Sequence, residues 1–351
     1  MKPTIALFTG DPAGIGPELV AGLLTRSDAA ARANIVLITH RSGIRGGLET
    51  LGASLELSTV DPRDLNGNDL QAPVLAAWPG IDADDFERAV AGARNGRFML
   101  DALAFGIDLC QRGLADALCF APLNKSALRA GGMTQADEMH WFADLLDHRG
   151  TCAEFNVLDT LWTSRVTSHV PLSAVSGLLS REKVAQAIEL ITRALKNAGV
   201  GEPRIAVCGL NPHNGDNGSF GREEIDIIGP GVELARERGF PADGPFPADT
   251  AFVRAIRQGP GNGYHGVVTM YHDQGQIAMK LMGFERGVTV QGGLPIVITT
   301  PAHGTAYDIA GRGIANRGAM DNAFALACRM GEVRRSGRTD SAQVSTESVH
   351  A

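Results

Sequence analysis

Three histidines occupy corresponding places in this sequence, each shortly after an apolar run that predicts a β-strand. They are His169, His213 and His272, and glycine or proline follows each within three residues. Because α/β proteins build their sites at the carboxyl edge of the sheet, we expect the three imidazoles to lie at that edge. Three protein ligands with an open fourth position are typical of a catalytic metal, most commonly zinc, although magnesium, manganese and cobalt are alternatives. Any one of these histidines alone would more often be structural, but their repeated placement favours a metal site.

An acidic residue and a glycine-rich turn add weaker signals. Asp249 lies in a proline-framed loop, where it could act beside a metal, although capping the helix that follows is the commoner role. Residues 10–18 read Gly-Asp-Pro-Ala-Gly-Ile-Gly-Pro-Glu and join a predicted strand to a predicted helix. The N–H groups at such a helix start can bind an anion, but turns of this kind are more often purely structural.

Composition excludes several classes of function. The 351-residue chain carries a formal net charge of −7, which argues against a general electrostatic attraction to nucleic acid or to an anionic membrane. No apolar run approaches the roughly 20 residues of a membrane span. Five cysteines without a C-x-x-C spacing are expected to be reduced core residues, and we expect a cytoplasmic enzyme with a small-molecule substrate.

Short β-rich runs alternate with helical patterns, which predicts an α/β fold with a largely parallel sheet. Helices are expected around residues 98–107 and 184–195. Residues 47–95 are less regular and are expected to form a peripheral excursion, and residues 333–351 are expected to be a disordered tail. The expected strands are residues 5–8, 35–38, 117–120, 165–169, 204–208, 267–270 and 295–299.

Six motifs together resemble one family over about residues 3–330. Besides residues 10–18 they are Ala-Pro-Leu-Asn-Lys at 121–125, Leu-Asn-Pro-His at 210–213, Pro-Ala-Asp-Thr at 247–250, Tyr-His-Asp-Gln-Gly at 271–275 and His-Gly-Thr-Ala-Tyr-Asp-Ile-Ala-Gly at 303–311. The chain resembles the 4-hydroxythreonine-4-phosphate dehydrogenases of vitamin B6 biosynthesis, whose fold is similar to isocitrate and isopropylmalate dehydrogenases. The resemblance implies two α/β/α domains. We expect one to comprise residues 1–130 and 287–332, and the other residues 131–286, with the metal ligands.

The resemblance also implies roles for the candidate ligands. His169, His213 and His272 would bind the divalent metal, with His272 supplied by the partner subunit of a homodimer. Asp249 and Lys280 would lie beside the substrate, although a surface lysine would look the same in sequence.

The implied chemistry is NAD(P)-linked oxidation of a secondary alcohol, after which the resulting β-keto acid loses carbon dioxide. Contacts to NAD or NADP are assigned to Asn211, Gly304 and Asp308 on loop resemblance, and His303 is a further candidate in the same loop.

Several substrate positions depart from the family pattern. Glu138 and Met139 replace a His-Thr pair, Thr289 replaces an asparagine and Ile298 replaces an arginine. Replacing a guanidinium by an aliphatic group, and adding a carboxylate, disfavours a phosphate monoester.

These departures predict a non-phosphorylated substrate, namely a carboxylated cis-dihydrodiol of the terephthalate type from aromatic catabolism. Met139, Trp141 and Ile298 would form the wall around its ring. Arg165 could anchor its carboxylate, since Arg165 and His169 would share one face of a strand over residues 165–169; a solvated arginine is an equal alternative.

Two other functions stay open. One is oxidation of 4-hydroxythreonine 4-phosphate or a four-carbon sugar-acid phosphate, with a rebuilt anion site. The other is a metal-dependent lyase, or an acyl- or phosphotransferase of the phosphotransacetylase type, on a similar fold. A catalytically silent regulatory homologue is disfavoured because the three histidines and Asp249 are all present.

Overall fold

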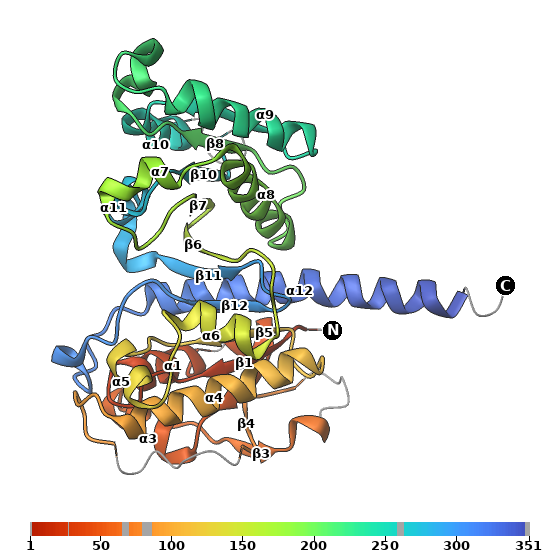
Figure 1. The fold of residues 1–351 in the computed structure, drawn as a ribbon. Helices are drawn as coiled ribbons and strands as arrows, with labels where there is room; N and C mark the ends of the chain where they lie inside the picture. The colour runs from red at the N-terminus through yellow and green to blue at the C-terminus, as the bar shows by residue number, and fades with distance from the viewer. Residues whose placement is uncertain (1, 27, 65–69, 79–85, 258–262, 348–351) are drawn as a thin grey trace. The chain divides into compact units, whose positions relative to one another are not determined.

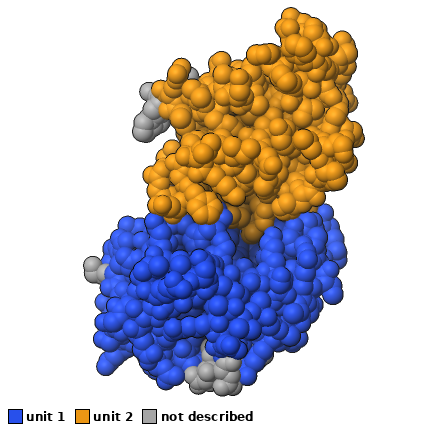
Figure 2. Space-filling view, turned by 90° about the vertical axis from the view of Figure 1, so that its left-hand side faces the viewer, with its two compact units in different colours: residues 1–149, 294–351 blue, residues 150–293 orange. Residues whose placement is uncertain are grey.

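The computed structural model describes residues 2–26, 28–64, 70–78, 86–257 and 263–347 (Figure 1). The chain divides into two compact units, which Figure 2 colours separately: unit 1 comprises residues 1–149 and 294–351, and unit 2 comprises residues 150–293. Unit 1 is therefore discontinuous in the chain, and its boundaries lie beyond the 130/131 and 286/287 given by the prediction. The reason is the short helix α5 (Lys125–Ala130), whose backbone meets that of α4 (Ala93–Gln111) at Gly96, so the chain remains in unit 1 beyond residue 130.

Unit 1 contains a parallel sheet with the strand order β3-β4-β2-β1-β5-β12. Its strands are β1 (Thr4–Phe8), β2 (Asn34–Ile38), β3 (Ser58–Val60), β4 (Val74–Ala76), β5 (Ala117–Phe120) and β12 (Val297–Pro301). Besides α4 and α5, its helices are α1 (Gly16–Leu24), α2 (Ala29–Arg32), α3 (Arg41–Thr50), α6 (Glu138–Leu145) and α12 (Gly318–Glu347).

Helices cover both faces of this sheet, which explains why its central strands are continuously apolar. Alternate residues point to opposite faces, and Phe8, Ile38 and Phe120 join the apolar residues of α4 in one fully buried cluster. On the other face Thr299 donates a hydrogen bond to the Ala323 carbonyl of α12. Parallel strands buried on both faces place their carboxyl ends along one edge, where β1, β5 and β12 lie side by side.

The segment between residues 47 and 95 contributes two strands of the sheet rather than a peripheral excursion. β4 pairs with β2 and β3 pairs with β4, and all three residues of β4 are buried. Each strand has only three residues, which is too short for an alternating pattern to be recognised in sequence.

The C-terminal segment is also more ordered than its composition predicts, since α12 continues to Glu347. Arg334 donates to the carbonyls of Cys110 and Asp116, and Arg338 pairs with the Asp116 carboxylate. Charged residues that composition assigns to a disordered tail therefore attach the helix to unit 1.

Unit 2 has the strand order β11-β6-β7-β10-β8-β9, in which β6 is antiparallel to both neighbours and the remaining pairs are parallel. Its strands are β6 (Ala153–Leu158), β7 (Leu161–Arg165), β8 (Ile205–Cys208), β9 (Ala242–Phe246), β10 (Gly266–Thr269) and β11 (Val288–Gly292). Its helices are α7 (Val175–Leu178), α8 (Arg181–Asn197), α9 (Gly229–Glu237), α10 (Ala248–Arg257) and α11 (His272–Gly283).

The core of unit 2 lies between its strands and the helices α10 and α11. Cys208, Phe252 and Met279 belong to one buried apolar cluster, while α8 packs on β7, β8 and β10. The α/β fold class is thus confirmed in both units. Among the residues described, no helix is long and apolar enough to cross a membrane.

Candidate active site

Three motifs of unit 1 converge at the carboxyl ends of β1, β5 and β12. The Asp11 amide donates to the Pro122 carbonyl at 3.0 Å, which joins the turn after β1 to the loop after β5. The Ile15 amide donates to the Thr305 carbonyl at 3.0 Å, and the loop at residues 303–311 therefore docks on the same turn. Gly10 has a positive φ of 73°, and a Cβ there would collide with the Ala121 carbonyl, so glycine is required.

A buried carboxyl group stands at the centre of this convergence. Asp11 is fully buried and accepts hydrogen bonds from the Tyr307 hydroxyl, the Ala13 amide and the Asn95 side chain. Burial raises the pKa of Asp11 more than these three hydrogen bonds lower it, and burial together with the Asp11 contact raises the pKa of Tyr307.

The nearby carboxylate of Glu18 accepts a hydrogen bond from the Gly311 amide at 2.9 Å. Sequence reasoning did not select Asp11, Glu18 or Tyr307 as site residues. The sequence did offer a signal for the two acids: Asp11 closely follows a buried strand, and Glu18 lies in the first turn of the helix that comes next.

The two cofactor candidates of unit 1 lie on this docked loop. Gly304 and Asp308 are both exposed, and a Cβ at Gly304 would meet no atom within 4 Å. A ligand could therefore approach the backbone there, and their assignment to the cofactor stays a prediction. Nδ1 of His303 lies 3.1 Å from the Gly304 carbonyl.

In unit 2, two of the three candidate metal ligands lie together. The ring centroids of His169 and His272 are 5.7 Å apart. Thr167 connects the loops that carry them, since its amide and its hydroxyl both donate to the Met270 carbonyl, at 3.1 Å and 2.8 Å. His169 has a φ of 50°, an unusual conformation for a residue with a side chain.

The separation of these two rings fits a shared metal ion. With Zn–N bonds of about 2.0–2.1 Å, two imidazoles on one tetrahedral ion have centroids roughly 5 Å apart. Nδ1 of His272 lies 2.7 Å from the Asp273 carboxylate, an arrangement that orients a ligating imidazole and leaves Nε2 for the metal.

His213 does not join this pair in the structure. It lies in a loop whose residues 213–217 all have positive φ, and the centre of its ring is 6.4 Å from the centre of the Phe220 ring. Within the described part of this chain, no three histidine, cysteine or acidic side chains are close enough to hold a metal together.

The remaining candidates of unit 2 are dispersed. Asn211 donates from its side-chain amide to Glu223 at 2.7 Å and to Glu224 at 3.0 Å, and these bonds fix the loop before His213. Asp249 is exposed in the first turn of α10, and Lys280 is exposed on α11, with its ammonium 5.8 Å from the Phe284 ring centre.

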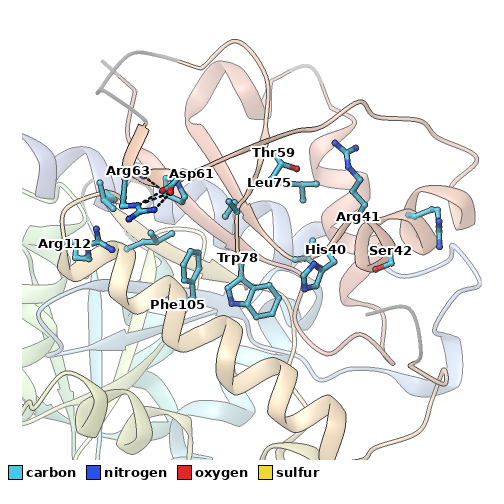
Figure 3. A pocket seen from close by; sticks show the side chains of 17 residues that line it. His40, Arg41, Ser42, Thr59, Asp61, Arg63, Leu75, Trp78, Phe105 and Arg112 are labelled. Carbon is cyan, nitrogen blue, oxygen red and sulfur yellow. Dashed lines mark hydrogen bonds and ion pairs between the residues drawn. The ribbon is translucent and has the colours of Figure 1, made fainter. Parts of the chain in front are cut away.

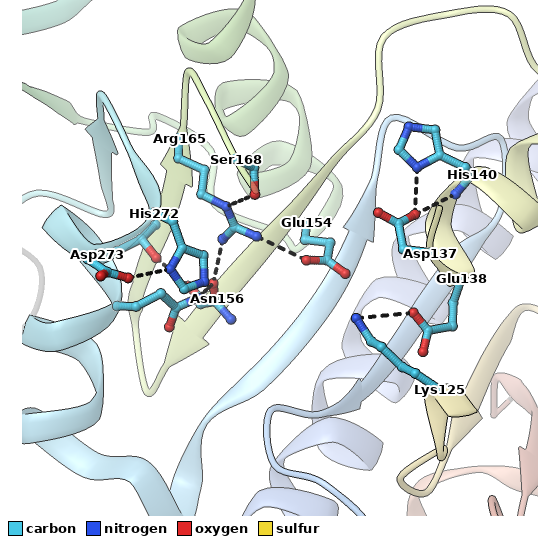
Figure 4. A network of polar contacts seen from close by, with 12 residues as sticks. Lys125, Asp137, Glu138, His140, Glu154, Asn156, Arg165, Ser168, His272 and Asp273 are labelled. Carbon is cyan, nitrogen blue, oxygen red and sulfur yellow. Dashed lines mark hydrogen bonds and ion pairs between the residues drawn. The ribbon is translucent and has the colours of Figure 1, made fainter. Parts of the chain in front are cut away.

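Arg165 is not a free anchor for a carboxylate. β7 ends at Arg165, four residues before His169, so the two do not share a strand. Its buried guanidinium donates to Glu154 at 3.0 Å, Asn156 at 3.0 Å and Ser168 at 2.8 Å (Figure 4). The charge of Arg165 is thus neutralised inside unit 2.

Ile298 cannot contribute to the wall that was predicted around a substrate ring. Ile298 has no exposed surface, because it lies within the apolar core of unit 1. Glu138 lies 3.6 Å from the Lys125 ammonium, which offsets the negative charge expected to repel a phosphate (Figure 4). Met139 is 9% exposed and Thr289 is half-buried on β11.

The structure thus has two α/β units, one with glycine turns gathered at a strand edge and the other with paired histidines. Comparison with known proteins shows the family. The chain belongs to the family described as pyridoxal phosphate biosynthetic protein PdxA, whose model matches residues 31–327. It is an NAD(P)-dependent oxidoreductase, in agreement with the prediction from its motifs.

Similar proteins are known over almost the whole chain. A provisionally named 4-hydroxythreonine-4-phosphate dehydrogenase 2 of Pseudomonas aeruginosa is 55% identical over 329 residues, covering 94% of this chain and 97% of the relative. A crystal structure of 4-hydroxythreonine-4-phosphate dehydrogenase from Klebsiella pneumoniae is 33% identical, with a TM-score of 0.82 over 94% of this chain and 98% of its own.

These relatives overturn the predicted dihydrodiol substrate. A terephthalate 1,2-cis-dihydrodiol dehydrogenase from Burkholderia xenovorans is only 26% identical, with a TM-score of 0.65 over 93% of this chain and 98% of its own. The more similar relatives are named for phosphorylated substrates. The prediction depended on the replacements at Glu138, Met139, Thr289 and Ile298 and on Arg165 as an anchor. Ile298 and Arg165 lie in the interiors of their units, and Glu138 is paired with Lys125. A phosphotransacetylase from Staphylococcus aureus shares the fold alone, at 13% identity.

Proposed function

We propose that this enzyme oxidises the secondary alcohol of a phosphorylated four-carbon hydroxy acid, with NAD(P) as the hydride acceptor. The strongest support is the 55% identity to a relative named for 4-hydroxythreonine 4-phosphate. A provisionally named D-threonate 4-phosphate dehydrogenase of Halalkalibacterium halodurans is 35% identical over 93% of this chain and 97% of its own. Both names describe a hydroxy acid with a terminal phosphate, and that shared chemistry defines the proposed substrate.

His169 and His272 are the proposed core of a divalent metal site, with zinc favoured because imidazole ligands suit it. The bound ion would polarise the substrate hydroxyl and then the carbonyl formed from it. The chain's own residues supply placement: Asp273 orients His272, and Thr167 holds the two histidine loops together.

NAD(P), when bound, would accept the hydride of the alcohol carbon, the hydroxyl proton would pass to an acid–base group, and a ketone would remain. Where a carboxylate lies two carbons from that ketone, loss of carbon dioxide follows. Asp249 and Lys280 are the proposed acid–base and substrate-positioning groups, and both are accessible to solvent in the structure.

A homodimer is the proposed functional state. Helix α11, which starts with His272, and the turn after it carry three exposed apolar side chains: Ile277 at 61%, Leu281 at 84% and Phe284 at 51% exposure. Exposed apolar groups of this size favour burial against another protein surface. A second copy covering α11 would bring its own histidines to the same place and complete the set that one chain leaves incomplete.

The test is reduction of NAD⁺ and of NADP⁺ by the zinc-loaded protein, followed by absorbance, with carbon dioxide release measured in parallel. Substrates are 4-hydroxythreonine 4-phosphate and D-threonate 4-phosphate, each beside its dephosphorylated counterpart. We expect turnover of at least one phosphate ester and none of either dephosphorylated acid. Equal turnover with and without the phosphate would contradict the proposal.

Metal content gives a second readout. His169→Ala should lose bound zinc, while His265→Ala should retain it, because His265 accepts a backbone hydrogen bond from Arg204 at the start of β8. Zinc retained in His169→Ala would remove this histidine from the site.

A further inference from the structure

A cavity of about 830 Å³ lies in unit 1, away from the loops described above (Figure 3). It is built at the carboxyl ends of three adjacent strands: His40 follows β2, Asp61 follows β3 and Trp78 follows β4. In parallel sheets, ligands bind outside the carboxyl ends of strands. Its volume is within the usual range for small-molecule sites.

The lining of this cavity is cationic. Four arginines contribute to it, Arg41, Arg45, Arg63 and Arg112, whereas Asp61 is the acidic residue among the described lining. The whole chain has a net charge of −7, so this concentration of guanidinium groups runs against the composition. Guanidinium groups bind phosphate and carboxylate through paired N–H donors.

The present partners of these arginines are easily exchanged. Arg63 pairs with Asp61, Arg112 with Asp108 and Arg45 with Glu49, and each of these arginines is about half exposed or more. Exposed ion pairs contribute little to stability, so replacing such a carboxylate by a ligand anion costs little. Arg41 donates to the Leu57 carbonyl, a neutral acceptor, which leaves its positive charge uncompensated by that contact.

The inner wall is apolar and aromatic. Leu75, Phe105 and Leu109 line it, and the His40 ring is stacked on Trp78 with centroids 5.1 Å apart (Figure 3). A ligand that fits must therefore combine an anionic group with a flat or apolar body. An inorganic anion alone would leave most of the volume unfilled.

We propose that this arginine-lined cavity is a second ligand site, which binds an organic phosphate of the size of a nucleoside monophosphate. The phosphate contacts Arg63 and Arg112, which lie next to each other at one end of the cavity (Figure 3), and the base lies against Phe105 and Trp78. The site is separate from the reaction centre, because neither the candidate metal histidines nor Gly304 and Asp308 contribute to its lining. It goes beyond the proposed dehydrogenase activity and does not depend on it.

The test is isothermal titration calorimetry of the purified full-length protein with AMP, with adenosine and with inorganic phosphate, each with and without saturating NAD⁺. We expect one AMP per chain, bound equally well in the presence of NAD⁺, and clearly weaker binding of adenosine and of phosphate. Quenching of tryptophan fluorescence by AMP should disappear in Trp78→Phe.

Matched variants distinguish the cavity from general charge. Arg63→Ala and Arg112→Ala should each weaken AMP binding about tenfold or more, the usual effect of losing a charge-assisted hydrogen bond. Arg97→Ala is the control, because Arg97 pairs with Asp101 on α4 as Arg112 pairs with Asp108, yet it does not line the cavity. Unfolding temperatures confirm that the variants are folded.

Three results would overturn the proposal. No AMP heat at millimolar ligand means that the cavity is no site for this chemistry. Displacement of AMP by NAD⁺ would place AMP in the cofactor site instead. Equal affinity in the Arg63, Arg112 and Arg97 variants would mean that the arginines do not hold the phosphate.

Discussion

Tyr307 donates a hydrogen bond to Asp11, a residue 296 positions earlier in the chain. The contact joins the loop after β12 to the turn after β1, and Asp11 is completely buried there. The loop at residues 303–311, which carries Gly304 and Asp308, is therefore held by a carboxyl group in the interior of unit 1.

Burial of Asp11 predicts a specific pH dependence of stability. Its native pKa is raised above the unfolded value of about 3.9, so the native state binds the extra proton. The stabilisation from this proton is complete below the unfolded pKa and is lost as pH rises through the native pKa. Asp11→Asn should remove this loss, so that the variant gains stability relative to the wild type between low and neutral pH. Urea unfolding at a series of pH values measures it, with the exposed Asp147→Asn as control; parallel pH profiles for wild type and Asp11→Asn would contradict the expectation.

The incomplete histidine set predicts complementation between inactive chains. His213→Ala and His272→Ala homodimers should each be inactive. A mixed dimer of the two should recover activity, because His213 and His272 of one proposed site come from different chains and one of the two sites then has a full set. Co-expression with two affinity tags isolates the mixed species. No recovery in a correctly assembled mixed dimer would show that a single chain provides both residues.

The Arg165 network predicts a loss of stability. Arg165→Ala leaves Glu154 as an unpaired charge in a largely buried place, which typically costs about 3–5 kcal/mol. The control is Arg193→Ala, whose pair with Glu189 is exposed and should contribute about 1 kcal/mol or less. Denaturant unfolding compares the two. A loss in Arg165→Ala no larger than in Arg193→Ala would mean that the network is not structural.

The cysteines predict selective labelling. Burial raises the pKa of Cys110, Cys119, Cys208 and Cys328 to about 12, so their thiols are protonated and inaccessible at neutral pH. Cys152 is the partly exposed thiol. A chromogenic thiol reagent should label about one cysteine per chain in the native protein and all five cysteines of the chain after unfolding. Rapid reaction of several native thiols would show that the cores open readily.

Much of the fold was predictable from local pattern, and β5 was predicted to the residue because Ala117–Phe120 is a short apolar run between turn signals. The strand expected over residues 165–169 was shifted, since β7 covers Leu161–Arg165. Arg165 is the last residue paired with β10, opposite Thr269, and beyond it the chain turns through a positive φ at His169. Pairing partners determine where such a strand ends, and local sequence does not encode them.

The site shows the same division between local and distant information. The prediction that the histidines lie at strand ends needed only the position of each strand in the sequence. In the structure the rings of His169 and His272 do lie together. Whether Ile298 or Arg165 could reach a substrate depended on what surrounds each side chain. Those neighbours, such as Glu154 for Arg165 and the core of unit 1 for Ile298, come from other elements.

The discontinuity of unit 1 has a consequence for synthesis on the ribosome. Residues 150–293 form a unit of their own, so they have all their internal partners once that stretch has left the exit tunnel. The sheet of unit 1 must wait, because β12 and α12, which supply the neighbour of β5 and the cover of one face, are made only after residues 150–293. Residues 1–149 therefore lack the partners that complete their sheet for as long as residues 150–293 are being made.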